Sequence, residues 1–145
     1  MLSVVPILSF YNVDRPTALF SDASRLNGLG FILKQQQEDG EWKLVQAGSR
    51  HLTDTESAYA MIELEALAAA WAMKKCRPFI EGLQFKLFID HQPLIPIMND
   101  YALDEIDNTR LLRLRRKMLR YDFQAVWIPG KENIEADALS RAPVD

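Results

Sequence analysis

The segment 17–33 constrains the fold of this chain more than any other stretch. Side chains along Thr17–Asp22 alternate between two faces, as in a β-strand, and Phe20 and Asp22 share one of those faces. A glycine-marked turn then leads into a second apolar run. A carboxylate at the end of an apolar strand is costly to bury without a partner or a cation. Asp22 is therefore either a turn-forming residue or part of a functional site.

The rest of the chain continues as alternating strands and helices. Residues 1–16 are predicted to be an extended arm at the junction to an upstream segment. Strands are predicted at 17–23, 28–35, 42–49, 84–90 and 123–128, and helices at 53–77, 107–121 and 132–140, with a short helix or turn at 91–94. The first three strands should form an antiparallel meander. The helix after them implies a right-handed crossover into parallel pairing, and hence an α/β fold.

The long helix carries two acids that need an explanation. It is predicted to open at a capping segment, 53–56, and to end before Pro78. Because it is apolar on almost every side, it should be buried. Glu63 and Glu65 lie two positions apart and so point in different directions, since helix neighbours are three or four positions apart. At most one of them reaches a given site, and their spacing does not decide which.

Two further acids stand in distinctive settings. Asp90 ends the fourth strand as Asp22 ends the first, and sites in sheets with such crossovers form at the carboxyl ends of strands. Asp137 lies among small and apolar residues of the last predicted helix. Carboxylates without His or Cys suit a hard cation such as Mg²⁺ or Mn²⁺. Several together suit a pair of ions about 4 Å apart that promote in-line attack at phosphate. Each acid alone could instead be a turn, ion-pair or surface residue.

Composition narrows the remaining possibilities. The 145 residues fit one domain, and 48% apolar and 26% charged residues are ordinary for a folded globular protein. A formal charge of −3 excludes a generally basic nucleic-acid binder, so affinity for polyanions must come from a local patch. The single cysteine, Cys76, is predicted to be a buried thiol in a reducing compartment. One Cys and two His also disfavour a zinc site, and no apolar run reaches membrane-spanning length.

Several short motifs follow one another in a recognisable order. They are Ser21-Asp22-Ala23-Ser24, Gly28-Leu29-Gly30, Ser49-Arg50, Leu52-Thr53, Tyr59…Glu63-Leu64-Glu65-Ala66-Leu67, Trp71-Ala72-Met73-Lys74-Lys75, Asp90-His91-Gln92-Pro93-Leu94 and Pro129-Gly130-Lys131-Glu132-Asn133…Ala136-Asp137-Ala138-Leu139-Ser140-Arg141. With these motifs, from about residue 6 to residue 143, the chain resembles the ribonuclease H domain of retrotransposon Pol polyproteins. The resemblance is closest to gypsy-type (metavirus) long-terminal-repeat elements, and it gives the domain the bounds 17–142.

The resemblance implies a ribonuclease H-like fold, with a five-stranded mixed sheet of three antiparallel strands followed by parallel strands, flanked by helices. It implies two Mg²⁺ ions, for which Mn²⁺ can substitute, and hydrolysis of the RNA strand of RNA–DNA hybrids to 5′-phosphate and 3′-hydroxyl ends during reverse transcription. It selects Glu65 over Glu63, which becomes a structural or surface residue. The catalytic and metal-binding residues carried over are Asp22, Glu65, Asp90 and Asp137.

The same resemblance implies partners and a location. The partners are an RNA–DNA hybrid and an upstream reverse transcriptase domain in the same polyprotein, with no membrane involved. The location is the cytoplasm, within a virus-like particle. Cellular relatives place a histidine ten residues before the last catalytic Asp, whereas this chain has Trp127 there. Proton transfer or product release must then be slower, or another group must fill the role of the histidine.

Substrate-binding residues are predicted on weaker grounds. Cellular relatives often have a basic protruding helix, but here the concentrated positive charge is a stripe on helix 107–121, opposite an apolar stripe of Leu111, Leu114, Met118 and Tyr121. The basic stripe consists of Arg110, Arg113, Lys117 and Arg120. The first three are predicted to contact phosphates, with a solvated helix face as the alternative. Ser24, Asn27 and Gln92 are predicted to touch sugar or phosphate, with turn or capping roles as the alternative.

Two other functions remain open at this stage. A catalytically silent module of a domesticated retroelement would keep the fold as a structural or interaction domain, and would usually have lost an acid. A nuclease of the same superfold acting on DNA alone would cut an all-DNA duplex as fast as a hybrid. Recognition of the 2′-hydroxyl separates that second function from a ribonuclease H.

Overall fold

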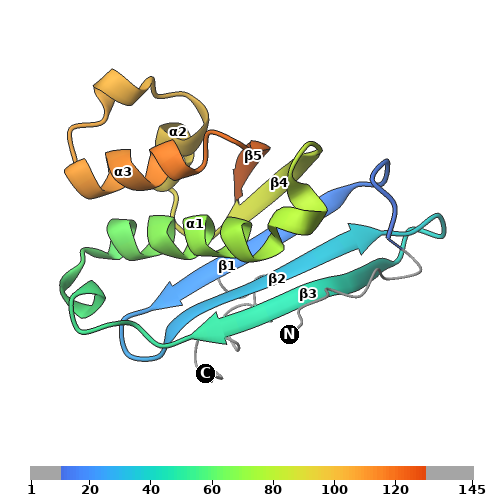
Figure 1. Ribbon diagram of the computed structural model, residues 1–145, viewed down its shortest axis with the longest axis horizontal. Coiled ribbons are helices and arrows are strands. Elements are labelled where there is room, and N and C mark those ends of the chain that lie inside the picture. The colour runs from blue at the N-terminus through green and yellow to red at the C-terminus, as the bar shows by residue number, and fades with distance from the viewer. Residues whose placement is uncertain (1–10, 130–145) are drawn as a thin grey trace.

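The computed structural model describes residues 11–129, which form a mixed five-stranded sheet with helices packed on it (Figure 1). The strand order is β3-β2-β1-β4-β5. The strands are β1 (Thr17–Ser24), β2 (Gly28–Gln36), β3 (Trp42–Arg50), β4 (Gln84–Ile89) and β5 (Asp122–Trp127). β1, β2 and β3 pair antiparallel, whereas β4 runs parallel to β1 and β5 runs parallel to β4. The predicted meander, crossover and α/β fold are confirmed.

The turn between β1 and β2 requires glycine at position 28. Gly28 has a φ of +110°, in the left-handed region that favours glycine. A Cβ at this position would lie 2.1 Å from the carbonyl oxygen of Arg50, the last residue of β3. The turn therefore closes directly against the end of β3, and a side chain would force the two apart.

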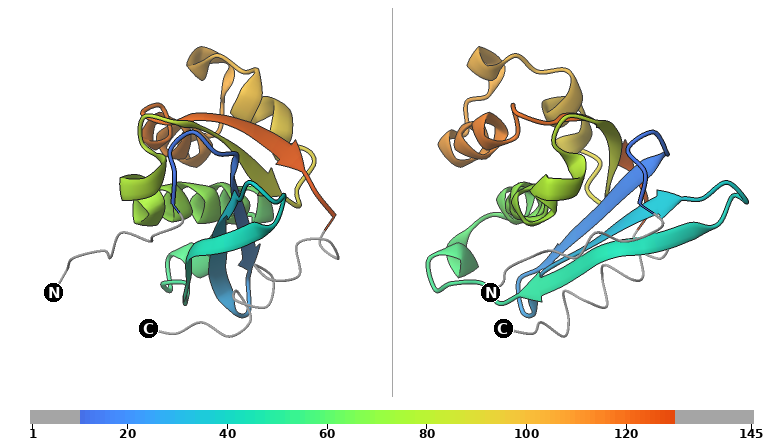
Figure 2. Two further views of the ribbon diagram at one scale, coloured as in Figure 1. Left: turned by 90° about the vertical axis from the view of Figure 1, so that its right-hand side faces the viewer. Right: turned by 45° about the vertical axis from the view of Figure 1, so that its right-hand side comes forward.

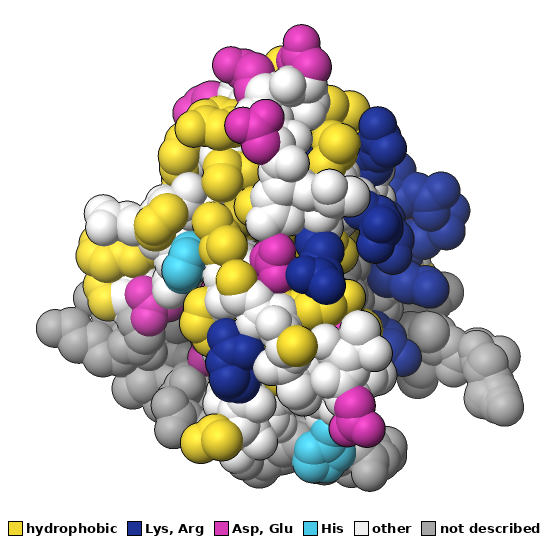
Figure 3. Space-filling view, turned by 90° about the vertical axis from the view of Figure 1, so that its left-hand side faces the viewer, with side chains coloured by type: hydrophobic (Ala, Val, Ile, Leu, Met, Phe, Trp, Pro, Cys, Tyr) yellow, Lys and Arg dark blue, Asp and Glu magenta, His cyan; other side chains and the backbone are white. Residues whose placement is uncertain are grey.

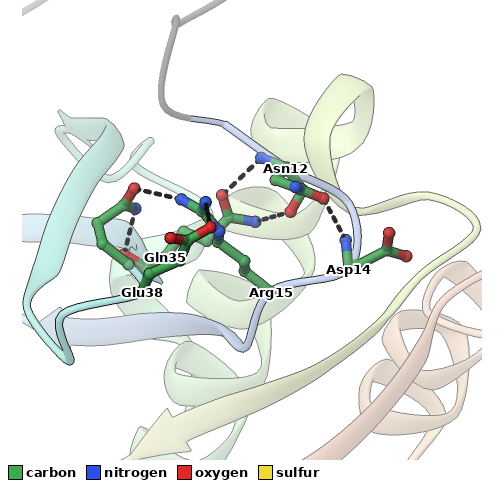
Figure 4. Close-up of polar contacts among 6 residues, drawn as sticks. Asn12, Asp14, Arg15, Gln35 and Glu38 are labelled. Carbon is green, nitrogen blue, oxygen red and sulfur yellow. Dashed lines mark hydrogen bonds and ion pairs between the residues drawn. The ribbon is translucent and has the colours of Figure 1, made fainter.

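Residues 11–16 lead into β1 and are tied to β2 and to the turn that follows it (Figure 4). The Asn12 N–H donates to Gln35 Oε1 at 2.8 Å, and Arg15 Nη2 lies 3.1 Å from Glu38 Oε1. Gln35 is fully buried, and its hydrogen bonds with Asn12 provide partners that a buried amide needs. The rest of the predicted arm lies outside the described residues.

The long helix α1 (Met61–Ile80) begins later than predicted. The capping segment does form, because the Glu56 N–H donates to Thr53 Oγ1 at 3.2 Å and the Thr53 N–H donates to Glu56 Oε1 at 2.9 Å. It opens only a 3₁₀ turn, Glu56–Ala58, because the backbone at Tyr59 is extended. The local capping prediction was correct, but the predicted start of the long helix was wrong.

The predicted end of α1 was also wrong, because the helix continues through Pro78 to Ile80. Proline lacks an N–H and disrupts helices at a cost of about 3 kcal/mol in an interior position. The side chains of Phe79 and Ile80 are buried, and each such burial contributes about 1.5–3 kcal/mol. The ring of Tyr11 packs edge-on against Phe79 with centroids 5.1 Å apart. Tertiary packing thus offsets the local effect of proline.

Helix α3 lies beside α1, and α1 covers one face of the sheet (Figures 1 and 2). α2 (Leu94–Asn99) and a 3₁₀ turn (Leu103–Glu105) connect β4 to α3 (Thr109–Lys117). α3 ends earlier than predicted, yet its apolar stripe is confirmed, since the four predicted side chains are all buried: Leu111, Leu114, Met118 and Tyr121.

The main core lies between α1, α3 and one face of the sheet. Leu19 of β1, Met73 of α1 and Leu87 of β4 are fully buried there. The Cys76 thiol is buried in the same core, and burial raises its pKa. No helix within residues 11–129 is long and apolar enough to cross a membrane. The last predicted helix, 132–140, lies outside the described residues.

Candidate active site

Asp22 and Asp90 lie at the same end of two adjacent parallel strands. Phe20 of β1 pairs with Phe88 of β4, and their rings stack with centroids 4.9 Å apart. Asp22 is two residues beyond Phe20, and Asp90 is two residues beyond Phe88, immediately after β4. Because parallel strands advance together, both acids arrive at the carboxyl edge of the sheet. Asp22 is half-buried and Asp90 is exposed.

Glu65 reaches the same edge from helix α1. Its side chain is buried, and Glu65 Oε1 accepts a hydrogen bond from the Ala23 N–H at 3.2 Å. A small apolar cluster of Ala23, Leu29, Leu64 and Ala68 holds this part of α1 on β1 and β2. The carboxylate of Glu65 is therefore fixed beside the residue that follows Asp22.

Glu63 has a different environment, which the sequence did not reveal. Glu63 Oε1 accepts from the Ala60 N–H at 2.9 Å, and Glu63 Oε2 accepts from Asn108 Nδ2 at 2.8 Å. Asn108 in turn caps α3, because its Oδ1 accepts from the Leu111 N–H at 3.0 Å. Glu63 thus joins the start of α1 to the start of α3. It is a buried structural residue.

Hydrogen bonding sets the ionisation of Glu63. The hydrogen bond from Asn108 lowers its pKa most, burial opposes this, and the Ala60 N–H and Arg110 lower it further. Arg110 Nη1 lies 3.4 Å from Glu63 Oε1, and its guanidinium stacks 4.3 Å from the centre of the Tyr59 ring. The ionised form of Glu63 is therefore the one that the fold stabilises.

The fourth predicted acid, Asp137, lies outside the described residues. Within residues 11–129, no three His, Cys, Asp or Glu side chains meet as a metal site complete in itself. What this part of the chain provides is an all-carboxylate set at one sheet edge: Asp22, Glu65 and Asp90. That donor chemistry fits a hard divalent cation and does not fit a soft one.

Comparison with known proteins identifies the family. The model of the RNase H-like domain found in reverse transcriptase matches residues 12–121. The chain belongs to this family.

The RNase H-like domain is similar to parts of two retrovirus-related Pol polyproteins of Drosophila melanogaster. It is 39% identical over 140 residues to that of transposon 297, covering 97% of this chain and 12% of the polyprotein. It is 35% identical over 137 residues to that of transposon gypsy, covering 93% of this chain and 12% of the polyprotein. The chain therefore spans only a small part of these relatives, and the predicted resemblance to gypsy-type elements is confirmed.

Two solved structures share the fold of the RNase H-like domain. RNase H1 from the halophilic archaeon Halobacterium salinarum NRC-1 superposes with a TM-score of 0.60 at 20% identity, covering 86% of this chain and 93% of that one. The foamy viral protease-reverse transcriptase in complex with RNA/DNA hybrid superposes with a TM-score of 0.55 at 15% identity, covering 81% of this chain and 16% of that one. RNase H-like enzymes generally use divalent metals, in agreement with the carboxylate set.

The predicted sugar- and phosphate-contacting residues have local roles in the RNase H-like domain. Ser24 Oγ accepts from the Asn27 N–H and from Asn27 Nδ2, each at 3.3 Å, which braces the β1–β2 turn. The Gln92 carbonyl accepts from the Ile95 N–H at 3.1 Å at the start of α2. These bonds leave the Gln92 side chain and the donor capacity of the Ser24 hydroxyl for other contacts. Substrate contact by these residues stays a prediction.

The predicted phosphate-binding residues of α3 are exposed. Arg113 and Lys117 project from the same side of the helix as Arg110, which alone of the three is engaged with Glu63. Trp127, which is predicted to replace the histidine of cellular relatives, ends β5 opposite Ile89 and is 43% exposed. Its strand partner Ile89 directly precedes Asp90 in the chain. The indole of Trp127 has no group that could transfer a proton.

Arg50 belongs to one of the sequence motifs, but its positioning role comes only from the structure. Its guanidinium donates to both carboxylate oxygens of Glu56, at 2.8 and 2.9 Å, and lies 5.7 Å from the centre of the Trp71 ring. The pKa of Glu56 is lowered chiefly by these hydrogen bonds. Arg25 also donates to the carbonyls of Ser57 and Tyr59, at 2.9 and 2.7 Å. Together the two arginines fix the segment that precedes α1.

Proposed function

We propose that this domain hydrolyses the RNA strand of RNA–DNA hybrids during reverse transcription of a retroelement. The observation that carries the proposal is the arrival of Asp22, Glu65 and Asp90 at one edge of the sheet, in a chain that belongs to the RNase H-like family. Carboxylates from a strand, a helix and a strand end are brought to this edge by the β1–β4 register and by the hydrogen bond between Glu65 and the Ala23 N–H.

Asp22, Glu65, Asp90 and Asp137 would hold two Mg²⁺ ions, for which Mn²⁺ substitutes. When bound, such ions lower the pKa of an attacking water and stabilise charge on the phosphate and the leaving oxygen. The chain itself supplies the orientation. The Ala23 N–H fixes one oxygen of Glu65, and the β1–β4 pairing sets the relative positions of Asp22 and Asp90 along the strand direction. The products would be 5′-phosphate and 3′-hydroxyl ends.

Selection of a hybrid would depend on sugar and backbone contacts near these acids. The 2′-hydroxyl both donates and accepts, which lets a protein distinguish RNA from DNA at one position. Ser24, Asn27 and Gln92 lie beside the β1–β2 turn and the start of α2, close to the acids along the chain. Arg110, Arg113 and Lys117 would neutralise phosphates along the duplex, a contribution that weakens as salt rises.

The proposed setting is a Pol polyprotein with a reverse transcriptase upstream, inside a cytoplasmic virus-like particle. Support comes from the curated relatives, which are Pol polyproteins of which this chain covers 12%. Further support comes from the foamy viral protease-reverse transcriptase, part of which shares this fold and whose structure is a complex with RNA/DNA hybrid.

Cleavage of an end-labelled RNA–DNA hybrid tests the proposal. With Mg²⁺ we expect cutting of the RNA strand alone, abolished by EDTA and by Asp22→Asn. Asp104→Asn is the matched control, because Asp104 is an exposed acid of the 3₁₀ turn and should leave the rate unchanged. An all-DNA duplex cut equally fast would instead indicate a DNA nuclease. No cutting by folded protein with either Mg²⁺ or Mn²⁺ would overturn activity of the isolated domain and favour a structural module.

A further inference from the structure

A basic groove runs between α1 and α3 on the outer side of α1. It has a volume of about 740 Å³, and its apolar floor includes Leu67, Trp71 and Leu114. Six cationic side chains line it: Arg50, Lys74, Arg77, Arg116, Lys117 and Arg120. In Figure 3, Lys and Arg side chains gather along the right-hand edge of the molecule, and acidic side chains gather at the top. This charge separation exists in a chain whose net charge is −3.

Acids on the protein neutralise only part of this charge. Glu56 is the one acid among the described residues that line the groove, and Arg50 engages it. Arg77 and Arg120 share Glu81, at 3.0 and 3.8 Å. The remaining three, Lys74, Arg116 and Lys117, form no ion pair with any residue in the described part of the chain and are exposed. Their charge is available to an anionic ligand.

The groove lies on the other side of α1 from the candidate active site. Successive helix residues are about 100° apart, so Lys74 lies about 180° around α1 from Glu65. Glu65 is directed to β1, whereas Lys74 lines the groove. A phosphate held at the carboxylates cannot at the same time lie in the groove. The ligand of the groove is therefore a different strand or a different part of the substrate.

The lining of the groove indicates what kind of anion fits. Trp71 has the Arg50 guanidinium over its ring and the ring of Phe31 at its edge, with centroids 5.1 Å apart. Its ring is thus committed to the fold, so the groove offers a ligand mainly cations, together with the exposed side chain of Leu119. A groove between two adjacent helices is also narrow compared with a duplex, because packed helix axes are only about 8–10 Å apart. A flexible single strand, followed along its phosphates, fits both features.

We propose that the α1–α3 groove binds single-stranded nucleic acid through its phosphate backbone, independently of base sequence. In a domain that removes RNA from a hybrid, this ligand is the strand left unpaired beside the cleavage site. This choice of strand rests on the proposed function, but binding itself needs neither metal nor cleavage and can be tested separately.

Fluorescence anisotropy with a labelled oligothymidylate of about 20 nucleotides tests this site in EDTA at low salt. The double variant Lys74→Glu/Arg116→Glu should weaken binding by more than about tenfold. The milder Lys74→Gln/Arg116→Gln should reduce the slope of log K against log salt by about 1.4, or 0.7 for each phosphate that is no longer neutralised. Thermal unfolding would check that both variants fold.

The matched control is Lys75→Glu. Lys75 is the neighbouring exposed lysine of α1, but it faces β3 beside Gln46 and Ser49 instead of the groove. The Lys75→Glu variant should bind oligothymidylate with an affinity within about twofold of that of the unaltered chain. Asp90→Asn should also bind normally, which separates a failure of this site from a failure of the catalytic proposal. The proposal would be overturned if the Lys74 and Lys75 variants weakened oligothymidylate binding equally, or if the unaltered chain did not bind it. Tighter binding of a polyglutamate peptide than of oligothymidylate would also overturn it, in favour of an acidic protein partner.

Discussion

Helix α1 has two sides with opposite chemistry. On the inner side, Leu64 and Ala68 pack on β1 and β2, and Glu65 is directed to the strand end that carries Asp22. On the outer side, Trp71 and Lys74 line a basic groove. The helix repeat separates these sides, so one element contributes both to the acidic sheet edge that is proposed to bind metal and to a groove lined by cations. The difference shows how a chain with a net charge of −3 can still present a concentrated positive surface.

The largest effect should come from the inner side of α1. Glu65→Gln keeps the size of the side chain and its hydrogen bond from Ala23, but removes a charge from the proposed metal site. We expect hybrid cleavage to fall by at least about 100-fold, since even changes to groups around metal ligands cost 10–100-fold. Glu63→Gln, two residues away, should keep most of the activity. Comparable losses in both variants, measured as initial cleavage rates, would remove the distinction between the two acids.

The turn that supports the inner side should tolerate no side chain. Gly28→Ala combines a φ of +110° with a Cβ 2.1 Å from the Arg50 carbonyl oxygen, so we expect a loss of about 3 kcal/mol or more in the free energy of unfolding. Gly40→Ala is the control, because Gly40 has a φ of +87° but a Cβ there would have no atom within 4 Å. The Gly40→Ala variant should lose only about 1–2 kcal/mol in the free energy of unfolding. Urea unfolding measures both, and equal losses would contradict the close approach to β3.

On the side of α1 that faces α3, Glu63 should make stability depend on acid pH. Hydrogen bonding from Asn108 is the main reason that its pKa lies below the ordinary value, and burial opposes that shift. The unfolded chain therefore binds a proton more readily than the folded one. The stabilisation is fully present above the ordinary pKa of a glutamate and is lost as pH falls through the lowered pKa of the folded state.

The Glu63→Gln variant tests this dependence. Glutamine still accepts from the Ala60 N–H, so at neutral pH we expect a loss of only about 1 kcal/mol from the weaker bonds to Asn108 and Arg110. The free energy of unfolding, followed from neutral pH into acid, should fall less steeply in the variant. Parallel curves for the two proteins would assign the acid sensitivity to other carboxyls, of which Glu56 is the next candidate.

The smallest effect should come from the outer side. Arg50→Lys keeps the charge beside Glu56 but replaces a bidentate contact with a single hydrogen bond. We therefore expect a loss of about 0.5–1.5 kcal/mol in the free energy of unfolding. Arg120→Lys, whose contact with Glu81 is exposed and 3.8 Å long, should change stability by less than about 0.5 kcal/mol. Thermal unfolding of the two variants would rank them. A larger effect at Arg120 would show that its contact with the end of α1 stabilises the fold more than the bond between Arg50 and Glu56 does.

The sequence by itself determined the antiparallel meander, the crossover into parallel pairing and the family of the chain. Alternation from Thr17 to Asp22 and the glycine turn are local signals, and the crossover that brings β4 beside β1 follows from a helix placed between strands. The same signals placed Asp22 and Asp90 at strand ends. The ends of α1 were not predictable in this way, because local capping and proline signals competed with burial of Phe79 and Ile80.

Only the tertiary structure decided which groups the two acids of α1 contact. Glu63 and Glu65 look alike in the sequence, since both stand in a buried apolar helix, and resemblance alone favoured Glu65. Their different partners, Asn108 of the α3 cap and the Ala23 N–H of β1, lie 45 and 42 residues away along the chain. The basic groove was hidden for the same reason, because its cations come from β3, α1 and the α3 region. Contacts between distant segments depend on packing, which no local pattern encodes.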